Sequence, residues 1–421
     1  MTAAGKFQVL REPSYRRLFL GRTASLIGDG ISPIALAFAI LDLTGSATDL
    51  GIVLAANGLV LVTLVLVGGV IADRISPRRA MLGADVTQTV SMGLIAVLLL
   101  TGTAEIWQLA LLYAVDGAAT AFFNPASNAI VPQIVPASRL QEANAMLTFS
   151  RWMGKVAGPA LAGVLLALGS PGSALAVDAA TFAVSAACIW GVRAPGVRLE
   201  GKGESFVAEL RHGWHEFSSR SWLVAVVFSA ATTNAIFFPA FQVLGPTVAR
   251  DSLDGSSSWA LIAALWGVGG LLGGLVAFWI RPRRPLLVSE SFILIFSLPI
   301  VLLAIPSTTV VIALGALLAG STVSLAEVLY ETTIAQHVPQ EALSRVTAYD
   351  WFGSLALQPI GLALIGPVAA GLGISTTLWL GAVTMTLCLL AVIAVPSVRR
   401  LETTVPDPTP VPPPRPIEAG D

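Results

Sequence analysis

The chain has 421 residues, of which 55% are hydrophobic and only 12% are charged, and its mean hydropathy is +0.79. Soluble domains carry about a quarter charged residues, so this chain has too little polar surface to cover a water-soluble globule. The net charge of −1 indicates no partner, because the charges are segregated along the chain. The two cysteines, Cys188 and Cys388, lie in apolar runs, which excludes a disulfide framework or a zinc cluster.

Apolar stretches long enough to cross a membrane, about 20 residues each, fill most of the sequence. They are continuous rather than alternating, which is typical of helices and not of barrel strands. The twelve predicted helices are residues 18–41, 48–72, 80–101, 106–126, 144–169, 172–192, 221–246, 257–280, 285–305, 308–330, 350–372 and 375–396. No short apolar stretch with a cleavage site precedes them, so we expect the first helix to act as the insertion signal.

The second six predicted helices repeat the first six. Residues 72–82 (ADRISPRRAML) match residues 277–287 (AFWIRPRRPLL) at six of eleven positions, with an offset of 205. Residues 135–149 align with residues 338–352 at an offset of 203. A unit of about 200 residues is too long for a solenoid repeat. It fits a duplicated membrane bundle, in which two halves face each other across a central binding site.

Basic residues lie almost entirely on one side of the predicted membrane. Of the 24 Lys and Arg residues, only Arg250 falls in a loop on the other side, beside Asp251 and Asp254. Cytoplasmic loops carry an excess of Lys and Arg. We therefore expect a multi-pass protein of the cell's inner (plasma) membrane with both termini in the cytoplasm.

These patterns divide the chain into four parts. Residues 1–192 and residues 221–398 are predicted to be two six-helix bundles. Residues 193–220 form the cytoplasmic linker, in which apolar residues recur at helical spacing and predict an amphipathic helix on the inner membrane face. Residues 399–421 are rich in proline, and we expect this tail to be disordered.

The loop between the second and third helices reads GVIADRISPRR and resembles the GxxxDRxGRR loop of the major facilitator superfamily. Twelve spans in two parallel halves extend the resemblance over almost the whole chain. It implies that the loop holds the halves together at the inner face when the cavity opens outward; the alternative is a basic loop that only sets topology. The residues concerned are Gly69, Asp73, Arg74, Arg78 and Arg79, with Arg283 and Arg284 in the second copy.

The loop departs from the family pattern at two places. Pro77 stands where the family usually has a basic residue, and in the second copy Phe278 and Trp279 replace the Asp-Arg pair. Only the two arginines of the second copy therefore remain as candidates for the same role.

Helix 5 carries Gly154, Gly158, Pro159 and Gly163 in GKVAGPALAG, which resembles the GxxxGPxxGG signature of the superfamily's antiporters. Small residues let helix backbones approach closely, and Pro159 removes a backbone donor and bends the helix. The alternative is ordinary small-residue packing, which the glycines of helix 8 also show. That glycine run is not a nucleotide-binding loop, because no strand precedes it and no GK[ST] follows.

Three further segments narrow the resemblance to one branch. GRTASLIGDG, FFNPASNAIVPQIVP and YETTIAQHVPQEALSRVTAYD resemble the macrolide-efflux and enterobactin-exporter branch of drug:proton antiporters. The resemblance implies alternating access, export of small amphipathic or drug-like compounds, coupling to protons and no cofactor. The expected partners are the substrate, protons and the lipid bilayer, with no nucleic acid, and we expect a monomer.

Ionisable residues in the membrane core are costly and are functional candidates by default. Asp29 and Asp116 lie near the middle of helices 1 and 4, and Glu327 lies in the inner part of helix 10. In the resembled fold, helices 1, 4, 7 and 10 line the cavity. The candidates for this cavity are Asn234, the polar residue in the middle of helix 7, Glu327, Arg22 and Arg151. The two arginines either balance a buried acid or extend to the lipid surface.

Asp29 and Asp116 are the candidates for proton coupling. Burial favours the neutral form of a carboxyl group, whereas a nearby arginine favours the charged form. Asp29 has both influences available, because Arg22 lies two turns before it, and we therefore prefer Asp29. Glu327 is expected to shape selectivity for cations.

Three other acids in predicted spans have different expected roles. Asp85 and Glu290 match each other at the offset of 205, and we expect them to pair with nearby arginines. Asp178 in helix 6 either satisfies a neighbouring group or takes part in transport.

Four classes of function compete for this sequence: exporter, uptake permease, non-transporting membrane sensor and membrane enzyme. The helix 5 motif argues against uptake, and a sensor would be expected to carry an additional signalling domain. No nucleophile–base set, HExxH motif or metal cluster occurs, so we predict no enzyme activity, no catalytic residue and no metal. A siderophore or metabolite exporter of the same fold remains an alternative substrate class.

Overall fold

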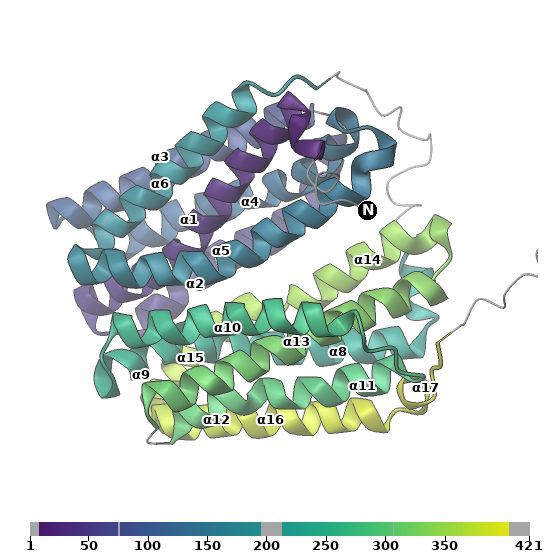
Figure 1. Cartoon of the computed structure of the whole chain (residues 1–421). Coiled ribbons are helices and arrows are strands. Elements are labelled where there is room, and N and C mark those ends of the chain that lie inside the picture. Colours follow the sequence, from purple (N-terminus) through teal and green to yellow (C-terminus); the bar gives the residue numbers. More distant parts are fainter. Residues whose placement is uncertain (1–7, 75, 195–212, 306, 404–421) are drawn as a thin grey trace, which may run out of the picture.

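A computed structural model describes residues 8–74, 76–194, 213–305 and 307–403 (Figure 1). The side chains of residues 65–74, 340, 341 and 344 lie outside this description. Most of the predicted amphipathic linker and nearly all of the proline-rich tail also lie outside it. Within the described ranges all regular structure is helical and no strand occurs.

The first half contains six long helices that match the six predicted spans. Two short helices precede α1 and α5, η2 (Gln8–Arg11) and η3 (Ala137–Arg139). The six helices are α1 (Pro13–Thr44), α2 (Ala47–Arg74), α3 (Pro77–Thr101), α4 (Ile106–Ile134), α5 (Leu140–Leu168) and α6 (Pro171–Trp190). Proline opens α1, α3 and α6, where its missing N–H costs nothing.

The second half contains six corresponding spans, three of which are broken. The elements are α8 (Ser221–Pro239), η4 (Ala240–Leu244), α9 (Gly245–Ser252), α10 (Ser256–Ala277), α11 (Pro285–Ile293), η5 (Leu294–Ser297), α12 (Leu298–Ala304), α13 (Thr309–His337), α14 (Gln340–Leu355), α15 (Gln358–Leu372), α16 (Ile374–Ala394) and α17 (Pro396–Arg399). The breaks lie at or beside Pro239, Pro299 and Pro359, because proline cannot donate the backbone hydrogen bond of a continuous helix.

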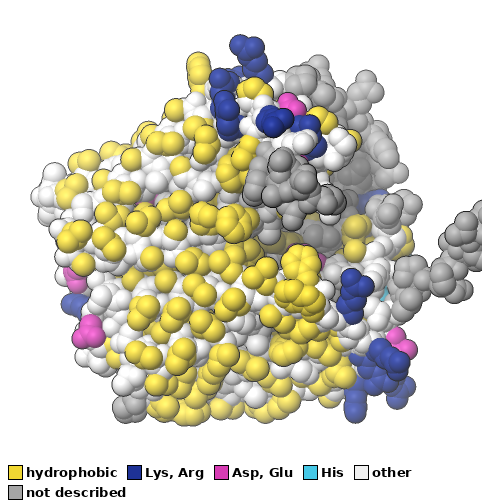
Figure 2. Space-filling model, viewed as in Figure 1, with side chains coloured by type: hydrophobic (Ala, Val, Ile, Leu, Met, Phe, Trp, Pro, Cys, Tyr) yellow, Lys and Arg dark blue, Asp and Glu magenta, His cyan; other side chains and the backbone are white. Residues whose placement is uncertain are grey.

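Eleven spans in the described part of the chain are long and apolar enough to cross a membrane. The remaining helix, α5, has 29 residues but carries Glu142 and Arg151 in its first half and Lys155 just past its middle. Large apolar side chains cover the outer sides of the bundle and form the hydrophobic surface of Figure 2. A surface of this kind suits lipid, so the predicted all-α membrane protein is confirmed.

The internal repeat is visible in the helices themselves. α4 and α13 have the same length, 29 residues each, and both ends of α13 follow those of α4 at the offset of 203. α3 and α11 both begin at a proline, Pro77 and Pro285, but these prolines lie 208 residues apart. The offset of 203 found in the sequence therefore relates the equivalent helices α4 and α13 of the two halves.

The halves contact each other along two helix pairs, α5 with α10 and α2 with α15 (Figure 1). Glycines allow both contacts: a Cβ at Gly267 of α10 would lie 2.4 Å from the Lys155 carbonyl oxygen, and one at Gly51 of α2 would lie 2.4 Å from that of Leu362. No side chain fits at such a distance, so glycine is needed where these backbones meet.

The two ends of the bundle differ in charge. We call the end that carries the beginning of α1, the end of α6, α14 and α17 the basic end, because Arg17, Arg78, Arg284, Arg399 and Arg400 gather there (Figures 1 and 2). At the opposite end Asp42 of α1 and Arg250 of α9 form an ion pair of 3.9 Å between the halves. The halves diverge toward the basic end (Figure 1).

The described part of the linker, residues 213–220, packs against the second half at the basic end. Residues 213–218 are helical, and Trp214 and Phe217 stack against each other at 5.7 Å between ring centroids. Both rings also pack on Tyr349 of α14, at 5.6 and 6.1 Å. The apolar face predicted for the linker thus covers α14 in this short segment.

Candidate functional site

Asp29 lies at the middle of α1 with a glycine on each side. A Cβ at Gly28 would lie 2.3 Å from the Asp178 Oδ1 atom of α6, and one at Gly30 would lie 2.6 Å from the Gly154 carbonyl oxygen of α5. These contacts hold α1 between α5 and α6. The Asp29 side chain therefore points away from both of these helices. The Asp29 side chain is exposed and has no hydrogen bond or ion pair to another described residue.

The helix 5 motif packs first on α1 and then on the other half. A Cβ at Gly154 would lie 2.4 Å from the Leu26 carbonyl oxygen, and one at Gly158 would lie 2.5 Å from the Gly30 Cα atom. One at Gly163 would lie 2.8 Å from the Ala260 Cβ atom of α10. The motif therefore supports the backbone around Asp29 from one side, and its last glycine lies at the junction of the halves.

Five charged residues form a group that joins the two halves electrostatically. Arg22 attracts Asp29 on the same helix, and Lys155 on α5 attracts Glu327 on α13. Arg151 repels both Arg22 and Lys155. We call these five residues, Arg22, Asp29, Arg151, Lys155 and Glu327, the central charge group.

The two arginines of the group have short-range partners in the first half. The Arg22 guanidinium donates to the Asn124 Oδ1 atom at 3.2 Å and lies 4.5 Å from the centroid of the Phe123 ring, both on α4. Arg151 donates to the Thr148 Oγ1 atom at 3.3 Å, one turn earlier on α5. Arg22 is thereby held toward α4, whereas Arg151 remains exposed.

Lys155 is the member of the group that sequence reasoning missed. It lies inside the helix 5 motif, one turn after Arg151, and that spacing within a span was the available signal. Its ammonium group lies 4.3 Å from the ring centroid of Trp152 and 5.8 Å from that of Trp266 on α10. It therefore contributes a charge and an aromatic contact between the halves.

Asp116 lies at a buried junction of α2, α3 and α4, and it repels Asp29 of the central charge group. Its Oδ2 atom accepts a hydrogen bond from Asn57 and its Oδ1 atom accepts one from Gln88, both at 3.2 Å. Asn57 also donates to the Tyr113 carbonyl oxygen at 2.8 Å. Two amide donors, rather than an arginine, compensate this buried carboxyl group.

The other membrane acids are paired with hydroxyl groups. Ser185 donates to Asp85 at 2.7 Å, and Ser32 donates to Asp178 at 2.8 Å. Each of these carboxyl groups, and that of Glu290, keeps one buried oxygen without a partner in the described structure. No ion pair within 4.0 Å joins Asp85 or Glu290 to an arginine among the described residues. Arg22 nevertheless attracts Asp85 at longer range.

Asn234 forms a hydrogen bond at a helix break. Its amide donates to the Ser354 carbonyl oxygen at 3.0 Å. Ser354 lies in the last turn of α14, where carbonyl groups lack partners within the helix. The hydrogen bond therefore connects α8 to the break between α14 and α15.

The predicted conformational loop is described only in part. The backbone of α2 continues to Arg74, whereas the surroundings of Gly69 and the side chains of Asp73 and Arg74 lie outside the described structure. Arg78 donates to the Ile189 carbonyl oxygen at 3.2 Å and to that of Trp190. The Ser76 side chain caps the start of α3 by accepting a hydrogen bond from the Arg79 backbone N–H. Arg78 thus closes the end of α6 within the first half, where a cation complements the helix dipole.

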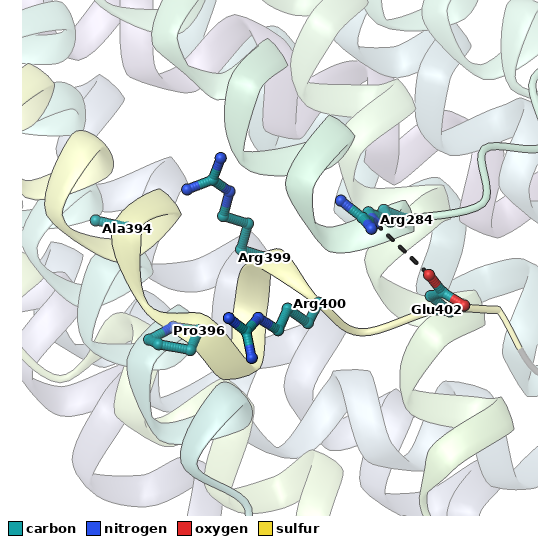
Figure 3. A pocket seen from close by; sticks show the side chains of 6 residues that line it. All are labelled: Arg284, Ala394, Pro396, Arg399, Arg400 and Glu402. Carbon is teal, nitrogen blue, oxygen red and sulfur yellow. Dashed lines mark ion pairs between the residues drawn. The ribbon is translucent and has the colours of Figure 1, made fainter.

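The second copy of the loop contacts the end of the chain. Arg284 pairs with Glu402 at 3.7 Å, and Arg399 and Arg400 lie beside this pair (Figure 3). The Arg283 carbonyl oxygen accepts a hydrogen bond from the Thr403 N–H at 3.1 Å. These described contacts of both copies remain within their own halves.

Comparison with known proteins identifies the family. The family model described as Major Facilitator Superfamily matches residues 18–361. The chain therefore belongs to the Major Facilitator Superfamily. It is a multi-pass membrane transporter and not an enzyme.

Two similar proteins are efflux pumps by name. The multidrug efflux pump Tap of Mycolicibacterium fortuitum is 28% identical over 415 residues, which covers 93% of this chain and 98% of the relative. The macrolide efflux protein A of Streptococcus pyogenes is 23% identical over 364 residues, covering 85% of this chain and 90% of the relative. The resemblance to the drug-efflux branch is thereby confirmed.

Solved structures of other transporters share the fold. A mutant of the nucleoside transporter NupG superposes with a TM-score of 0.78 at 13% identity and covers 90% of this chain and 99% of its own. A mutant of the peptide transporter POT in complex with sulfate has a TM-score of 0.75 at 12% identity, covering 94% and 99%. At such identities the likeness concerns the fold alone.

Proposed function

We propose that this transporter exports small amphipathic, drug-like compounds in exchange for protons. The observation that carries the proposal is the central charge group, in which an exposed carboxyl group in the middle of α1 belongs to the same electrostatic group as Lys155 and Glu327. Charged residues at mid-membrane depth are energetically costly and by default mark a substrate or ion pathway. The names of the two similar efflux proteins support the direction and the compound class.

The proposed cycle assigns different tasks to the two halves. Asp29 takes up a proton from one side and releases it to the other, while Glu327 favours cationic substrates on the opposite half. Arg22 offers a countercharge to Asp29 once its proton has left. Asp116 is the alternative proton carrier, but both of its carboxyl oxygens already accept a hydrogen bond from an amide group.

The loop motif and the helix 5 motif have proposed roles in the conformational change. Asp73, Arg74 and the neighbouring arginines hold the halves together when the basic end is closed. The glycines of α5 pack that helix closely on α1 and let it slide on α10, because alternating access moves one half against the other around the binding site. The two bundles, 1–192 and 221–398, are the proposed moving units, within a monomer.

A compound panel tests the exporter proposal. Cells that express the chain should accumulate less of at least one amphipathic compound than cells with an empty vector, and a protonophore should remove the difference. Proton coupling predicts this because the protonophore collapses the driving gradient. Export that persists without a proton gradient would rule out the antiport mechanism. Net uptake of the compound would favour the uptake permease instead.

The proposed topology predicts which sites are reachable from outside. Tags at residues 1 and 421 should be inaccessible in intact cells, because nearly all basic residues lie toward the termini's side of the membrane. A cysteine that replaces Asp254 should react with an impermeant thiol reagent. The natural cysteines, Cys188 and Cys388, are first replaced by serine. If a terminal tag is labelled in sealed cells, the proposal that both termini lie on the cytoplasmic side of the inner (plasma) membrane is wrong.

A further inference from the structure

The ammonium group of Lys155 lies against two tryptophan rings that come from different halves. Its distance to the ring centroid is 4.3 Å for Trp152 of α5 and 5.8 Å for Trp266 of α10. A cation within about 6 Å of a ring face is attracted by the negative face of the ring, and tryptophan binds cations best. The two rings therefore form a cation site, and a side chain of the chain itself fills it.

Glycines hold both rings in place. A Cβ at Gly270 of α10 would lie 1.9 Å from the Trp152 ring, and one at Gly320 of α13 would lie 2.9 Å from the Cδ1 atom of the Trp266 ring. The Trp152 ring thus packs across the junction of the halves, on a glycine of α10. Rings that are held in this way offer a preorganised surface, which lowers the entropic cost of binding a ligand.

Trp266 also has a polar group that lacks a partner. Its buried indole N–H has no acceptor in the described structure. Buried donors are almost always hydrogen-bonded in folded proteins. An acceptor atom of a bound molecule would satisfy this donor, which is a second sign, independent of the ring contacts, that a ligand binds beside Trp266.

The charges around Lys155 are of both signs. Glu327 of α13 attracts it, Glu331 lies one turn further along the same helix, and Arg151 of α5 repels it. No ion pair within 4.0 Å joins Lys155 to a described acid. The flexible four-carbon stem of lysine can therefore turn away without breaking a close salt bridge.

We infer that Lys155 is a tethered competitor for cationic substrates. An organic cation, such as an aromatic or alkyl ammonium ion, occupies the place between Trp152 and Trp266 only after Lys155 has moved out of it. Glu327 then interacts with the substrate charge in place of the lysine charge. The inference deepens the proposed export function: Lys155 sets the selectivity of the site between cations and uncharged or anionic compounds.

Two probes of the same shape and opposite charge test this inference. Tetraphenylphosphonium and tetraphenylborate are titrated into the purified full-length protein in detergent micelles by calorimetry, with protein-free micelles as the blank. Lys155→Met keeps most of the stem but removes the charge. It is expected to bind the phosphonium about tenfold more tightly than the wild type, as fits a desolvated cation–π contact. It should bind the borate no more tightly.

Two further variants serve as controls for charge and folding. Lys155→Arg keeps the charge and should retain the low phosphonium affinity of the wild type. Arg151→Met removes an equal charge from the same helix one turn earlier, at a residue with no described ring contact. Its gain should stay below about threefold, because solvent screens charges that act at a distance. An equal gain in Arg151→Met would overturn the inference and leave only a net-charge effect.

The rings are tested in the background of the first variant. Adding Trp266→Leu to Lys155→Met should remove the tenfold gain, since the freed cation site loses one of its walls. No gain in Lys155→Met, or a gain that survives the loss of the ring, would also overturn the inference. The titrations are carried out in micelles, without a proton gradient, and so measure binding independently of export. A failure of proton-driven export together with the tenfold shift would therefore reject the proposed function and leave the cation site standing.

Discussion

Asp29→Asn is expected to bind substrate normally and to lose export against a concentration gradient. The variant keeps the size of the side chain but cannot carry a proton across the membrane. One proton that moves down a pH difference of two units releases about 2.7 kcal/mol, which sustains a roughly 100-fold substrate gradient at one proton per substrate. The expected accumulation ratio in the variant is therefore about 1.

Proteoliposomes with an imposed pH difference measure this effect. Accumulation of a labelled substrate reports uphill transport, and exchange of labelled for unlabelled substrate reports whether the variant still binds and cycles. Asp42→Asn is the matched control. Asp42 is an exposed acid on the same helix, at the end of the bundle that lies opposite the basic end. If Asp29→Asn and Asp116→Asn both concentrate substrate with normal pH dependence, these acids are structural and the coupling assignment is wrong.

Gly158→Ala is expected to damage both stability and transport. The new Cβ would lie 2.5 Å from the Gly30 Cα atom and 2.8 Å from the Ile27 carbonyl oxygen, and both are backbone atoms of α1. The helices must separate, and overpacking of this kind costs about 1–3 kcal/mol. Separation also displaces Asp29, because Gly30 is its neighbour. We therefore expect a lower melting temperature and a loss of most export activity.

Gly83→Ala is the matched control for this substitution. Gly83 lies in α3, and a Cβ there would meet nothing within 4 Å. Alanine is a better helix former than glycine, so this variant should be at least as stable as the wild type. Melting by size-exclusion chromatography and export are compared for both variants at equal expression. A Gly158→Ala protein that is as stable and active as Gly83→Ala would show that the α1–α5 contact has room to relax.

Local sequence patterns predicted the elements of the fold well, but not all their ends. The span predicted at 221–246 is one path through the membrane, yet it consists of α8, η4 and α9. The span predicted at 350–372 begins ten residues earlier, at Gln340, and breaks before Gln358. Hydrophobicity reports where a segment crosses the membrane, whereas proline and the neighbouring helices decide where its helix is interrupted.

Side-chain partners were the part that local patterns could not supply. Asp116 is compensated by Asn57 of α2 and Gln88 of α3, and neither amide stands out in an apolar helix. Asp85 is paired with Ser185, one hundred residues away, and not with an arginine that is near in sequence. Hydrogen bonds of this kind depend on which helix faces which, and that depends on packing over the whole bundle.

The sequence by itself determined that this chain is a duplicated, twelve-span transporter of the Major Facilitator Superfamily, because hydrophobicity, charge segregation and the loop motif are properties of the linear chain. It also singled out Asp29, since an acid in an apolar span is conspicuous wherever the helix packs. Only the tertiary structure showed that Lys155 lies between Trp152 and Trp266. The reason is physical: cation–π contacts act over a few ångströms, and α10 comes this close to the backbone at Lys155 because Gly267 has no side chain.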